Sequence, residues 1–322
     1  MTDAETTTHG ASERTALAVE ETGTLVARIT ENVERVIIGQ RDAIEHIVIA
    51  LLARGHLLLE DVPGVGKTML ARSIARSVDC SFSRVQFTPD LLPSDVTGVN
   101  VFNQKTREFE FQPGPVFGNV VLGDEINRAP PKTQSALLEA MEESQVTVDG
   151  TTHPLPNPFT VIATQNDVEL SRTYELPVAE IDRFMKKLHL GYPDEADETE
   201  LLDRVANRHP IETLEPVAST EDVLRARETV GAVAVSEPIR SYVSQLATYT
   251  RNHAELGVSP RGSIALVRAS QARAVLDGRD YVVPDDVQTE VPSVWAHRIR
   301  PETGSETGRG IVQAALGDVA VE

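Results

Sequence analysis

This chain has a single cysteine, no long apolar run and no basic segment near its start. Each of these features excludes a class of protein. The single cysteine, Cys80, excludes an internal disulfide and is typical of a protein of the reducing cytoplasm, where we expect this one to be. No apolar run reaches the ~20 residues of a membrane-spanning helix, so we expect no membrane span. Residues 1–20 include neither the basic nor the apolar part of a signal peptide and predict a polar, disordered tail.

Basic residues are also scarce, and lysine most of all. The 322 residues include 49 acidic and 30 basic side chains, a net charge of −19, and only five of the basic residues are lysines. This balance fits an ordinary acidic protein or a halophilic one whose surface is adapted to molar salt, and the lack of lysine favours salt adaptation. A strongly negative chain repels a phosphate backbone, so nucleic acid is an unlikely partner.

The first half of the chain alternates short apolar runs with longer periodic segments. Strands are expected at 56–60, 84–87, 119–124, 159–164 and 186–190, and helices at 40–53, 67–78, 131–143 and 178–183. This alternation predicts an α/β fold, a three-layer αβα sandwich around a parallel sheet. Segments 99–114 and 145–155 alternate around turn residues instead and predict two β-hairpins inserted into this fold.

The second half of the chain is helical in pattern. Helices are expected at 196–207, 220–231, 237–253, 262–276 and 284–290, with a loop at 301–310 and a last short helix after it. We therefore divide the chain into a tail (1–20), an α/β core (21–192) and a small all-helical lid domain (193–322).

The string LLLEDVPGVGKTML (57–70) predicts a phosphate-binding loop between a strand and a helix. Gly64 and Gly66 allow successive backbone N–H groups to turn toward one anion at the helix N-terminus. Lys67 would reach the β- and γ-phosphates, and the Thr68 hydroxyl would bind Mg²⁺. Asp61 stands where the usual pattern has its first glycine, but that position shapes the entry to the loop and does not contact phosphate. The loop therefore predicts ATP binding.

Three polar groups follow the loop at positions suited to hydrolysis. VVLGDEIN (120–127) ends a strand in two carboxylates: Asp124 could hold Mg²⁺, and Glu125 could polarise the attacking water. The strand in FTVIATQND (159–167) is followed by Asn166, whose amide could orient the same water. Together these groups indicate an enzyme that hydrolyses ATP.

Two arginines could stabilise the charge that develops on the transferred phosphoryl group. Arg183 stands at the end of a short helix, after Asp182 and before the last expected strand, where it would serve a neighbouring subunit. Arg261 begins a helix after Pro260, and a cation at a helix N-terminus is unfavourable unless an anion compensates it. We expect Arg261 to reach the γ-phosphate from above.

These strings together resemble the MoxR family of AAA+ ATPases. The resemblance is carried by LEDVPGVGKT (59–68), GDEINRAPPKTQSALLEAMEE (123–143), ATQN (163–166), LPVAEIDRFM (176–185) and SPRGSIALVRASQARAVLDGRDYVVPDDV (259–287), and it covers about residues 20–317. It implies that Glu125, Asn166, Arg183 and Arg261 are catalytic, with Arg183 as the arginine finger and Arg261 as sensor 2. It implies that the cofactors are ATP and Mg²⁺, with Thr68 and Asp124 as metal ligands. The nucleotide-binding set is then Gly39, Gln40, Pro63, Gly64, Val65, Gly66, Lys67, Thr68, Met69 and Asp124.

The resemblance also implies a function: a homo-oligomeric ring, expected to be a hexamer, that couples ATP hydrolysis to chaperone-like remodelling or activation of partner proteins. Such partners often carry a von Willebrand factor A domain, and the outcome can be metal or cofactor insertion. Two alternatives stay open, a regulatory switch that binds ATP without turnover and a DNA-acting AAA+ motor. The mixed charges of 99–110 and the lack of Lys and Arg in 146–155 make the DNA motor the weaker of the two.

Overall fold

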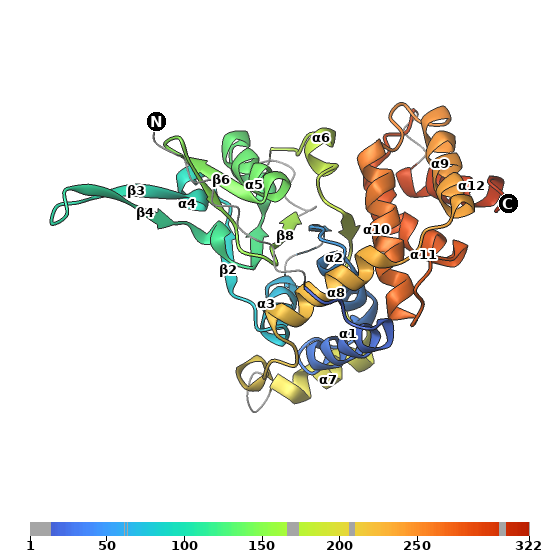
Figure 1. Cartoon of the computed structure of the whole chain (residues 1–322), viewed down its shortest axis with the longest axis horizontal. Helices are drawn as coiled ribbons and strands as arrows, with labels where there is room; N and C mark the ends of the chain where they lie inside the picture. Colours follow the sequence, from blue (N-terminus) through green and yellow to red (C-terminus); the bar gives the residue numbers. More distant parts are fainter. Residues whose placement is uncertain are drawn as a thin grey trace, which may run out of the picture.

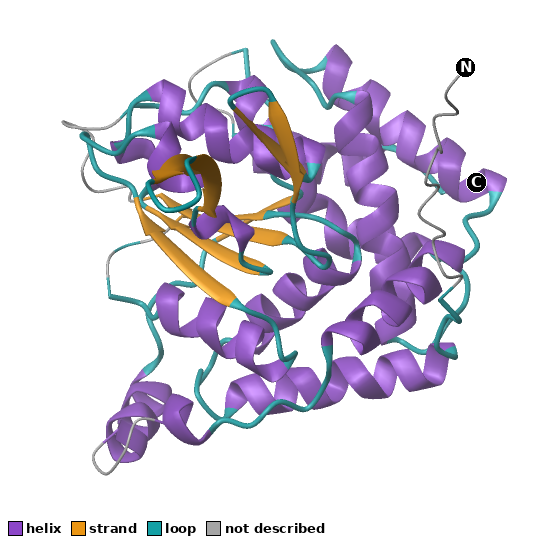
Figure 2. Ribbon diagram, turned by 60° about the vertical axis from the view of Figure 1, so that its left-hand side comes forward, coloured by secondary structure: helices purple, strands orange, loops and turns teal. Residues whose placement is uncertain are grey.

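The computed structural model describes residues 14–60, 62, 64–165, 174–205, 210–302 and 307–321. It confirms the α/β class: five parallel strands lie in the order β2-β5-β8-β1-β9, with helices on both faces of the sheet (Figures 1 and 2). The strands are β1 (Leu57–Glu60), β2 (Phe82–Gln86), β5 (Val120–Asp124), β8 (Thr160–Gln165) and β9 (Lys186–Leu188). Each of the five overlaps a strand expected from the sequence.

The helices surround this sheet and then continue into a helical C-terminal half. The first six are α1 (Val19–Glu34), α2 (Arg41–Leu52), α3 (Lys67–Ser77), α4 (Pro93–Thr97), α5 (Pro131–Glu143) and α6 (Val178–Ile181). The next six are α7 (Glu195–Val205), α8 (Thr220–Ala232), α9 (Glu237–Asn252), α10 (Pro260–Leu276), α11 (Pro284–Trp295) and α12 (Gly308–Asp318). Short 3₁₀ turns are η1 (Pro115–Phe117), η2 (Ile126–Arg128), η4 (Pro210–Thr213) and η5 (Ala296–Arg298). Among the described residues, no helix is both long and apolar enough to cross a membrane.

Consecutive apolar residues of the central strands divide between two cores, because side chains alternate across a sheet. Leu57 and Leu59 of β1 belong to the larger buried cluster with α1, α2 and α3, whereas Leu58 belongs to a second cluster on the α5 side. In β8, Ile162 faces the first cluster and Val161 the second. The uninterrupted apolar runs in the sequence therefore correspond to strands that are covered on both faces.

Helix α1 is not among the elements expected from the sequence. Leu25, Val26, Ile29 and Val33 recur at helical spacing and are buried in the larger cluster. The pattern is difficult to recognise in the sequence because acidic residues, which occupy the solvent-facing side of the helix, lie between the apolar ones. The expected core boundary at residue 21 falls inside this helix.

Both predicted hairpins are confirmed. Strands β3 (Gly98–Asn103) and β4 (Glu108–Pro113) form a two-stranded arm that projects far from the sheet at the left of Figure 1. Strands β6 (Gln145–Val148) and β7 (Thr151–Pro154) pair around a turn in which Asp149 and Gly150 both have positive φ. Exposed aromatic side chains on the arm, Phe102 and Phe109, pack on each other.

The C-terminal helices are not separated from the sheet by a break in packing. Helix α8 contacts α1 and α2, and the larger apolar cluster runs without interruption from α1 to α12. In Figure 1, α8 lies beside α2, while α9 to α12 form a group at the right. The domain boundary at 192/193 stays a prediction.

A buried ionic network joins the sheet to the C-terminal helices. The fully buried Lys186 of β9 pairs with the equally buried Glu290 of α11, and its Nζ lies 2.8 Å from His46 Nδ1 of α2. Arg273 of α10 donates to Glu290 at 2.9 Å and lies 3.3 Å from Glu45 of α2. Burial lowers the pKa of Lys186 to about 8 although Glu290 acts against it. Such groups are tolerated inside a protein only when they are paired.

Candidate nucleotide-binding site

The site lies at the edge of the sheet where strands β1, β5 and β8 end. These three strands are neighbours in the sheet and parallel, so their carboxyl ends meet. A pocket of about 320 Å³ opens there, lined by Gly64, Gly66, Lys67, Thr68, Met69, Arg84, Asp124, Glu125 and Thr164. The structure thus brings the phosphate-loop residues together with the two expected carboxylates.

The backbone of the loop is shaped for an anion. Gly64 and Gly66 both have φ of +91°, a conformation that side chains with a Cβ rarely adopt. A Cβ built on either glycine would meet no atom within 4 Å, so the space in front of the loop is open. Helix α3 begins at Lys67, directly after Gly66, and its N-terminal N–H groups are available to an anion at the loop.

Thr164 connects the two carboxylate residues. Its hydroxyl donates to Asp124 Oδ1 at 2.7 Å and accepts a hydrogen bond from the backbone N–H of Glu125 at 2.8 Å. Glu125 has left-handed backbone geometry, with φ of 56°, which costs a non-glycine residue of order 1–3 kcal/mol. The hydrogen bond from its N–H to Thr164 helps to hold this turn, and the turn directs the Glu125 carboxylate into the pocket.

Strand β2 adds two polar side chains to the same pocket edge. Arg84 donates to Asp124 Oδ2 through Nε at 3.2 Å and to Gln86 Oε1 at 2.7 Å. Gln86 in turn donates to Glu125 Oε2 at 2.8 Å, and the same oxygen accepts from Arg128 at 2.7 Å. The orientation of the Glu125 carboxylate is therefore fixed from two sides.

The resemblance to the MoxR family also implies that segment 36–40 lies near the adenine, and in the structure an apolar cluster joins this segment to Met69 of the same pocket. Gly39 has φ of +70°, and the carboxylate of Asp197 packs so closely that a Cβ on Gly39 would lie 1.9 Å from its Oδ2. Gln40 donates to the backbone carbonyl of Leu190 at 3.0 Å. A small apolar cluster beside them consists of Val36, Ile37, Met69, Ile211 and Leu214. It joins the 36–40 segment to Met69, next to the phosphate loop, and offers an apolar surface to a flat base.

Arg183 and Arg261 are not brought to the phosphate loop of their own chain. Neither lines the pocket above; both line a separate pocket between the sheet and α10, together with Arg54, Arg268 and Arg298. Glu142 at the end of α5 pairs with both: Arg183 Nε lies 3.3 Å from its Oε2, and Arg261 contacts its Oε1. We call this site the arginine pocket. The two arginines lie together, as a pair that acts on one group would.

Arg298 fixes the segment that carries Arg183. This buried side chain donates to the backbone carbonyls of Asp182 at 3.0 Å, Phe184 at 2.7 Å and Met185 at 3.1 Å. Its Nε lies 2.9 Å from Asp182 Oδ1, which also accepts from Ser259 next to Arg261. Burial lowers the pKa of Arg298 to about 10, so it stays charged at neutral pH. The helical half of the chain thus sets the position of the expected arginine finger.

Several site residues were expected and others were missed. Asn166 and Pro63 lie outside the described residues, so their expected roles stay predictions. Thr164, Gln86 and Arg298 were missed by sequence reasoning. The signal for Thr164 is a hydroxyl at the carboxyl end of its strand, two residues before Asn166; no comparable local signal marks Arg298.

Comparisons with known proteins agree with this geometry. The chain matches the family model for the ATPase family associated with various cellular activities (AAA) over residues 56–186, and the AAA lid domain over residues 246–315. The first match contains the phosphate loop, Asp124, Glu125 and Arg183. The second contains Arg261 and Arg298.

Relatives resemble almost the whole chain. The YeaC protein of Bacillus subtilis is 53% identical over 308 residues, covering 94% of this chain and 96% of that protein. Chaperone MoxR1 of Mycobacterium tuberculosis is 42% identical, covering 87% and 76%, and protein MoxR of Methylorubrum extorquens is 35% identical, covering 85% and 87%. A crystal structure from Cytophaga hutchinsonii superposes with a TM-score of 0.89 at 39% identity, covering 94% of this chain and 97% of that one. The chain therefore belongs to the MoxR family of AAA+ ATPases.

Proposed function

We propose that this protein hydrolyses ATP at sites shared between the subunits of a homohexameric ring. One observation carries the proposal: the phosphate-loop pocket and the arginine pocket are separate within one chain. This phosphate-binding site has a pair of carboxylates but neither Arg183 nor Arg261 beside it, and it is completed if a neighbouring copy supplies these two arginines. During transfer, the negative charge on the phosphoryl group is stabilised by such cations. In many phosphoryl-transfer reactions a second protein supplies the arginine.

The donors around the pocket fit a nucleotide with Mg²⁺. The Thr68 hydroxyl and the Asp124 carboxylate line the same pocket and are hard oxygen ligands of the kind Mg²⁺ prefers. When bound, Mg²⁺ would neutralise charge on the β- and γ-phosphates. Arg84 contacts Asp124, so Arg84 would have to share or release that carboxylate when a metal ion binds.

Each catalytic side chain then has a defined task. The Gly64–Gly66 backbone and Lys67 bind the phosphates, while Glu125, oriented by Gln86 and Arg128, accepts the proton of the attacking water. Asn166 would position that water. Arg183 and Arg261 of the neighbouring copy stabilise the charge on the γ-phosphoryl oxygens, because a guanidinium matches their geometry.

We propose further that the energy serves to remodel or activate a partner protein, one that carries a von Willebrand factor A domain, with metal or cofactor insertion as one outcome. Support comes from the β3–β4 arm, whose Phe109 is 71% exposed and Phe102 49%. Exposed apolar side chains on a projecting arm favour contact with protein. A DNA track would instead require cations there, and Lys105 and Arg107 are accompanied by Glu108 and Glu110.

The test of a shared site is the ATPase rate per subunit as a function of protein concentration, in molar KCl with Mg²⁺. We expect the specific rate to rise with concentration. Arg183→Ala and Lys67→Ala should each be inactive alone and regain activity when mixed, because some interfaces then combine an intact loop with an intact arginine. A negligible rate at every concentration with nucleotide still bound would instead favour the regulatory switch.

The partner is tested with Glu125→Gln, which should bind ATP without hydrolysing it and so hold clients. We expect affinity capture at high salt to recover a specific protein with a von Willebrand factor A domain, and recovery of no specific protein would contradict the chaperone function.

The proposed adaptation to salt predicts that the specific ATPase rate increases from low to molar KCl. A rate that only falls as KCl is added would contradict it.

A further inference from the structure

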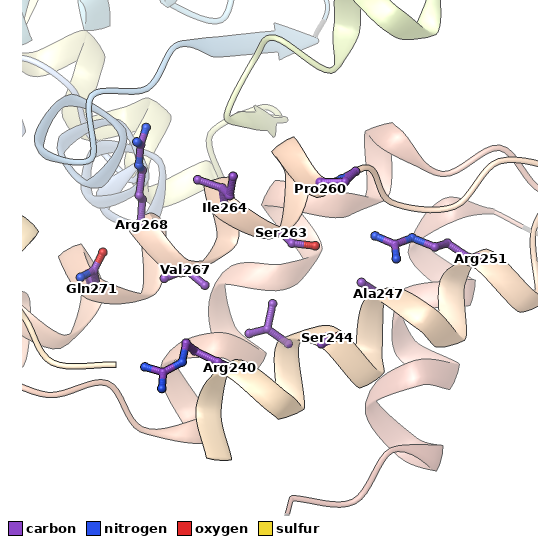
Figure 3. A pocket seen from close by; sticks show the side chains of 11 residues that line it. Arg240, Ser244, Ala247, Arg251, Pro260, Ser263, Ile264, Val267, Arg268 and Gln271 are labelled. Atoms are coloured by element: carbon purple, nitrogen blue, oxygen red, sulfur yellow. The ribbon is translucent and has the colours of Figure 1, made fainter. Parts of the chain in front are cut away.

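A groove runs between α9 and α10 on the outer side of the helical half (Figure 3). It has a volume of about 550 Å³, and both helices contribute residues at helical spacing. Arg240, Ala247 and Arg251 lie along α9, and Ile264, Val267 and Arg268 along α10. Positions three, four and seven residues apart on two helices form the kind of trough that receives a third helix.

The chemistry of the groove indicates what kind of helix would bind. Its floor is apolar, and Ile264 is 55% exposed. Arg240, Arg251 and Arg268 have no carboxylate partner within the described part of the chain; Arg240 and Arg251 donate to backbone carbonyls. Three arginines thus line one groove of a chain whose net charge is −19. The groove therefore fits an acidic helix that carries an exposed apolar side chain.

Helix α7 of this same chain has that character. It contains five acidic residues and one basic residue, and Leu202 is 64% exposed. Its inner face is anchored: Asp197 packs on Gly39, and Arg204 donates to the carbonyls of Glu34 and Arg35 at 2.9 Å. The outer face, by helical spacing, carries Glu195, Glu198 and Leu202, all exposed. An acidic face with one leucine complements a basic trough with an apolar floor.

The positions of α7 and of the groove match the two halves of the proposed shared site. The groove shares Ile264 and Arg268 with the arginine pocket, so the two are adjacent. Helix α7 is anchored on Gly39, beside the phosphate-loop pocket. A neighbour whose arginine pocket faced the nucleotide would therefore bring its adjacent α9/α10 groove close to the site that α7 borders.

We propose that α7 of one subunit docks in the α9/α10 groove of the next, with Leu202 against Ile264 and with Glu195 and Glu198 toward the groove arginines. This inference rests on the proposed shared site and adds to it a specific contact between subunits. Because α7 touches Gly39 through Asp197, the contact also links the neighbouring subunit to the expected adenine segment.

Cross-linking between two differently tagged copies tests the contact. Both copies carry Cys80→Ser, which removes the single native thiol; one also carries Leu202→Cys and the other Ile264→Cys. With Mg-ATP and a short bis-maleimide, we expect a covalent dimer that carries both tags. Gln245→Cys replaces Ile264→Cys in the control, because Gln245 is exposed on the opposite side of α9 and should give little product.

Three outcomes of the cross-linking would count against the docking. A link within one chain, an adduct with a different cellular protein, or equal yield with Gln245→Cys would mean that α7 of a second copy is not the occupant. Mixing Lys67→Ala with Arg183→Ala under the same conditions reports the shared site separately. Recovered ATPase activity without the Leu202–Ile264 product would overturn the docking and leave the proposed function intact. The cross-linked product without recovered ATPase activity would support the docking and contradict the proposed function.

Charge exchange gives a second, independent test. Arg240→Glu with Arg251→Glu, or Glu195→Arg with Glu198→Arg, should each raise the concentration for half-maximal assembly roughly tenfold or more, since like charges then face each other. All four substitutions in one chain should recover the wild-type value. Assembly weakened by the sum of both pairs would mean that these residues do not meet.

Discussion

The phosphate-loop pocket and the arginine pocket are held in different ways. In the first, the functional groups come from a loop and strand ends of one sheet, and short hydrogen bonds between Asp124, Thr164 and Glu125 connect them. In the second, arginines from both halves of the chain share one carboxylate, Glu142, and Arg298 holds the intervening segment.

This difference indicates which half of the site can move. Because hydrogen bonds within the sheet hold Asp124, Thr164 and Glu125, we expect these groups to keep their geometry when the C-terminal helices shift. The arginine pocket spans the sheet and α10, so a shift of the helical half would change the position of Arg183 and Arg261 together. Under the proposed function, one subunit would activate water and the next would control the timing of the reaction.

The largest expected effect is on the phosphate side. Glu125→Gln should lower the ATPase rate about 10²–10⁴-fold, because the amide cannot accept the proton of water. Nucleotide affinity, measured by titration with a fluorescent ATP analogue, should be kept. Glu139→Gln, an exposed position on α5, is the matched control and should leave the rate unchanged. A rate that survives Glu125→Gln would remove Glu125 from the mechanism.

Arg298→Met should impair the arginine side and leave the phosphate side intact. Loss of a buried charge partner typically costs about 3–5 kcal/mol of folding stability, because the Asp182 carboxylate and four backbone carbonyls lose their donor. Turnover at saturating ATP should fall while ATP binding to the loop persists. The control is Arg300→Met, whose side chain is 65% exposed in a pair with Glu255. Equal losses of stability in the two variants, by urea unfolding, would contradict the assigned role.

Thr164→Val should have a smaller effect, confined to the two carboxylates. The substitution keeps the shape but removes both hydrogen bonds of the bridging hydroxyl. The bond from the Glu125 N–H is neutral and contributes about 1 kcal/mol, and the bond to the Asp124 carboxylate contributes about 1.5–3 kcal/mol. We expect a fall in turnover of about fivefold to tenfold. Thr160→Val on the same strand is the control, since the Thr160 hydroxyl is buried without a partner among the described residues. A larger effect at Thr160 would show that strand packing, not the bridge, decides the rate.

The same contrast explains what sequence reasoning could and could not find. The strands, the loop and the carboxylates of the phosphate side follow local patterns: a continuous apolar run, a glycine spacing, a polar residue at a strand end. Parallel strands then require those ends to meet. Thr164 could have been included by the same argument. Arg84 and Gln86 could not, because their strand lies at the sheet edge and its order in the sheet is not written in the local sequence.

The arginine side depends on contacts between distant segments. Arg261 was singled out because it begins a helix, yet its place beside Arg183 follows from how α10 packs on the sheet. Arg298 lies 116 residues from its partner Asp182, and it resembles any other arginine of the sequence. Helix α1 was missed for a different reason, since its apolar stripe is diluted by the acidic solvent face.

The smallest effect at neutral pH is expected for His56, which lies beside the arginine pocket. Because His56 titrates, its effect depends on pH and distinguishes this pocket from the phosphate-loop pocket. Its Nδ1 accepts a hydrogen bond from the Val161 N–H at 3.0 Å and its Nε2 lies 3.0 Å from the Met141 carbonyl, so the neutral ring fits and a second proton does not. Burial lowers the pKa of His56 to about 4, below its ordinary value of 6.5. The contribution of neutral His56 to the free energy of unfolding is fully present above pH 6.5. It decreases as the pH falls toward 4, by up to about 3 kcal/mol.

His56→Gln sharpens the test, because an amide can accept from Val161 and donate to Met141 without titrating. Urea unfolding of both proteins between pH 7 and pH 4 should give curves that agree at pH 7 and diverge below pH 6.5, with the wild type losing more stability. His46, whose pKa burial also lowers to about 4, contributes equally to both proteins and cancels in the difference. Parallel curves would mean that the ring accepts a proton in place. The sheet would then adjust at the arginine pocket, and the hydrogen bonds of His56 to Val161 and Met141 would not exclude a second proton.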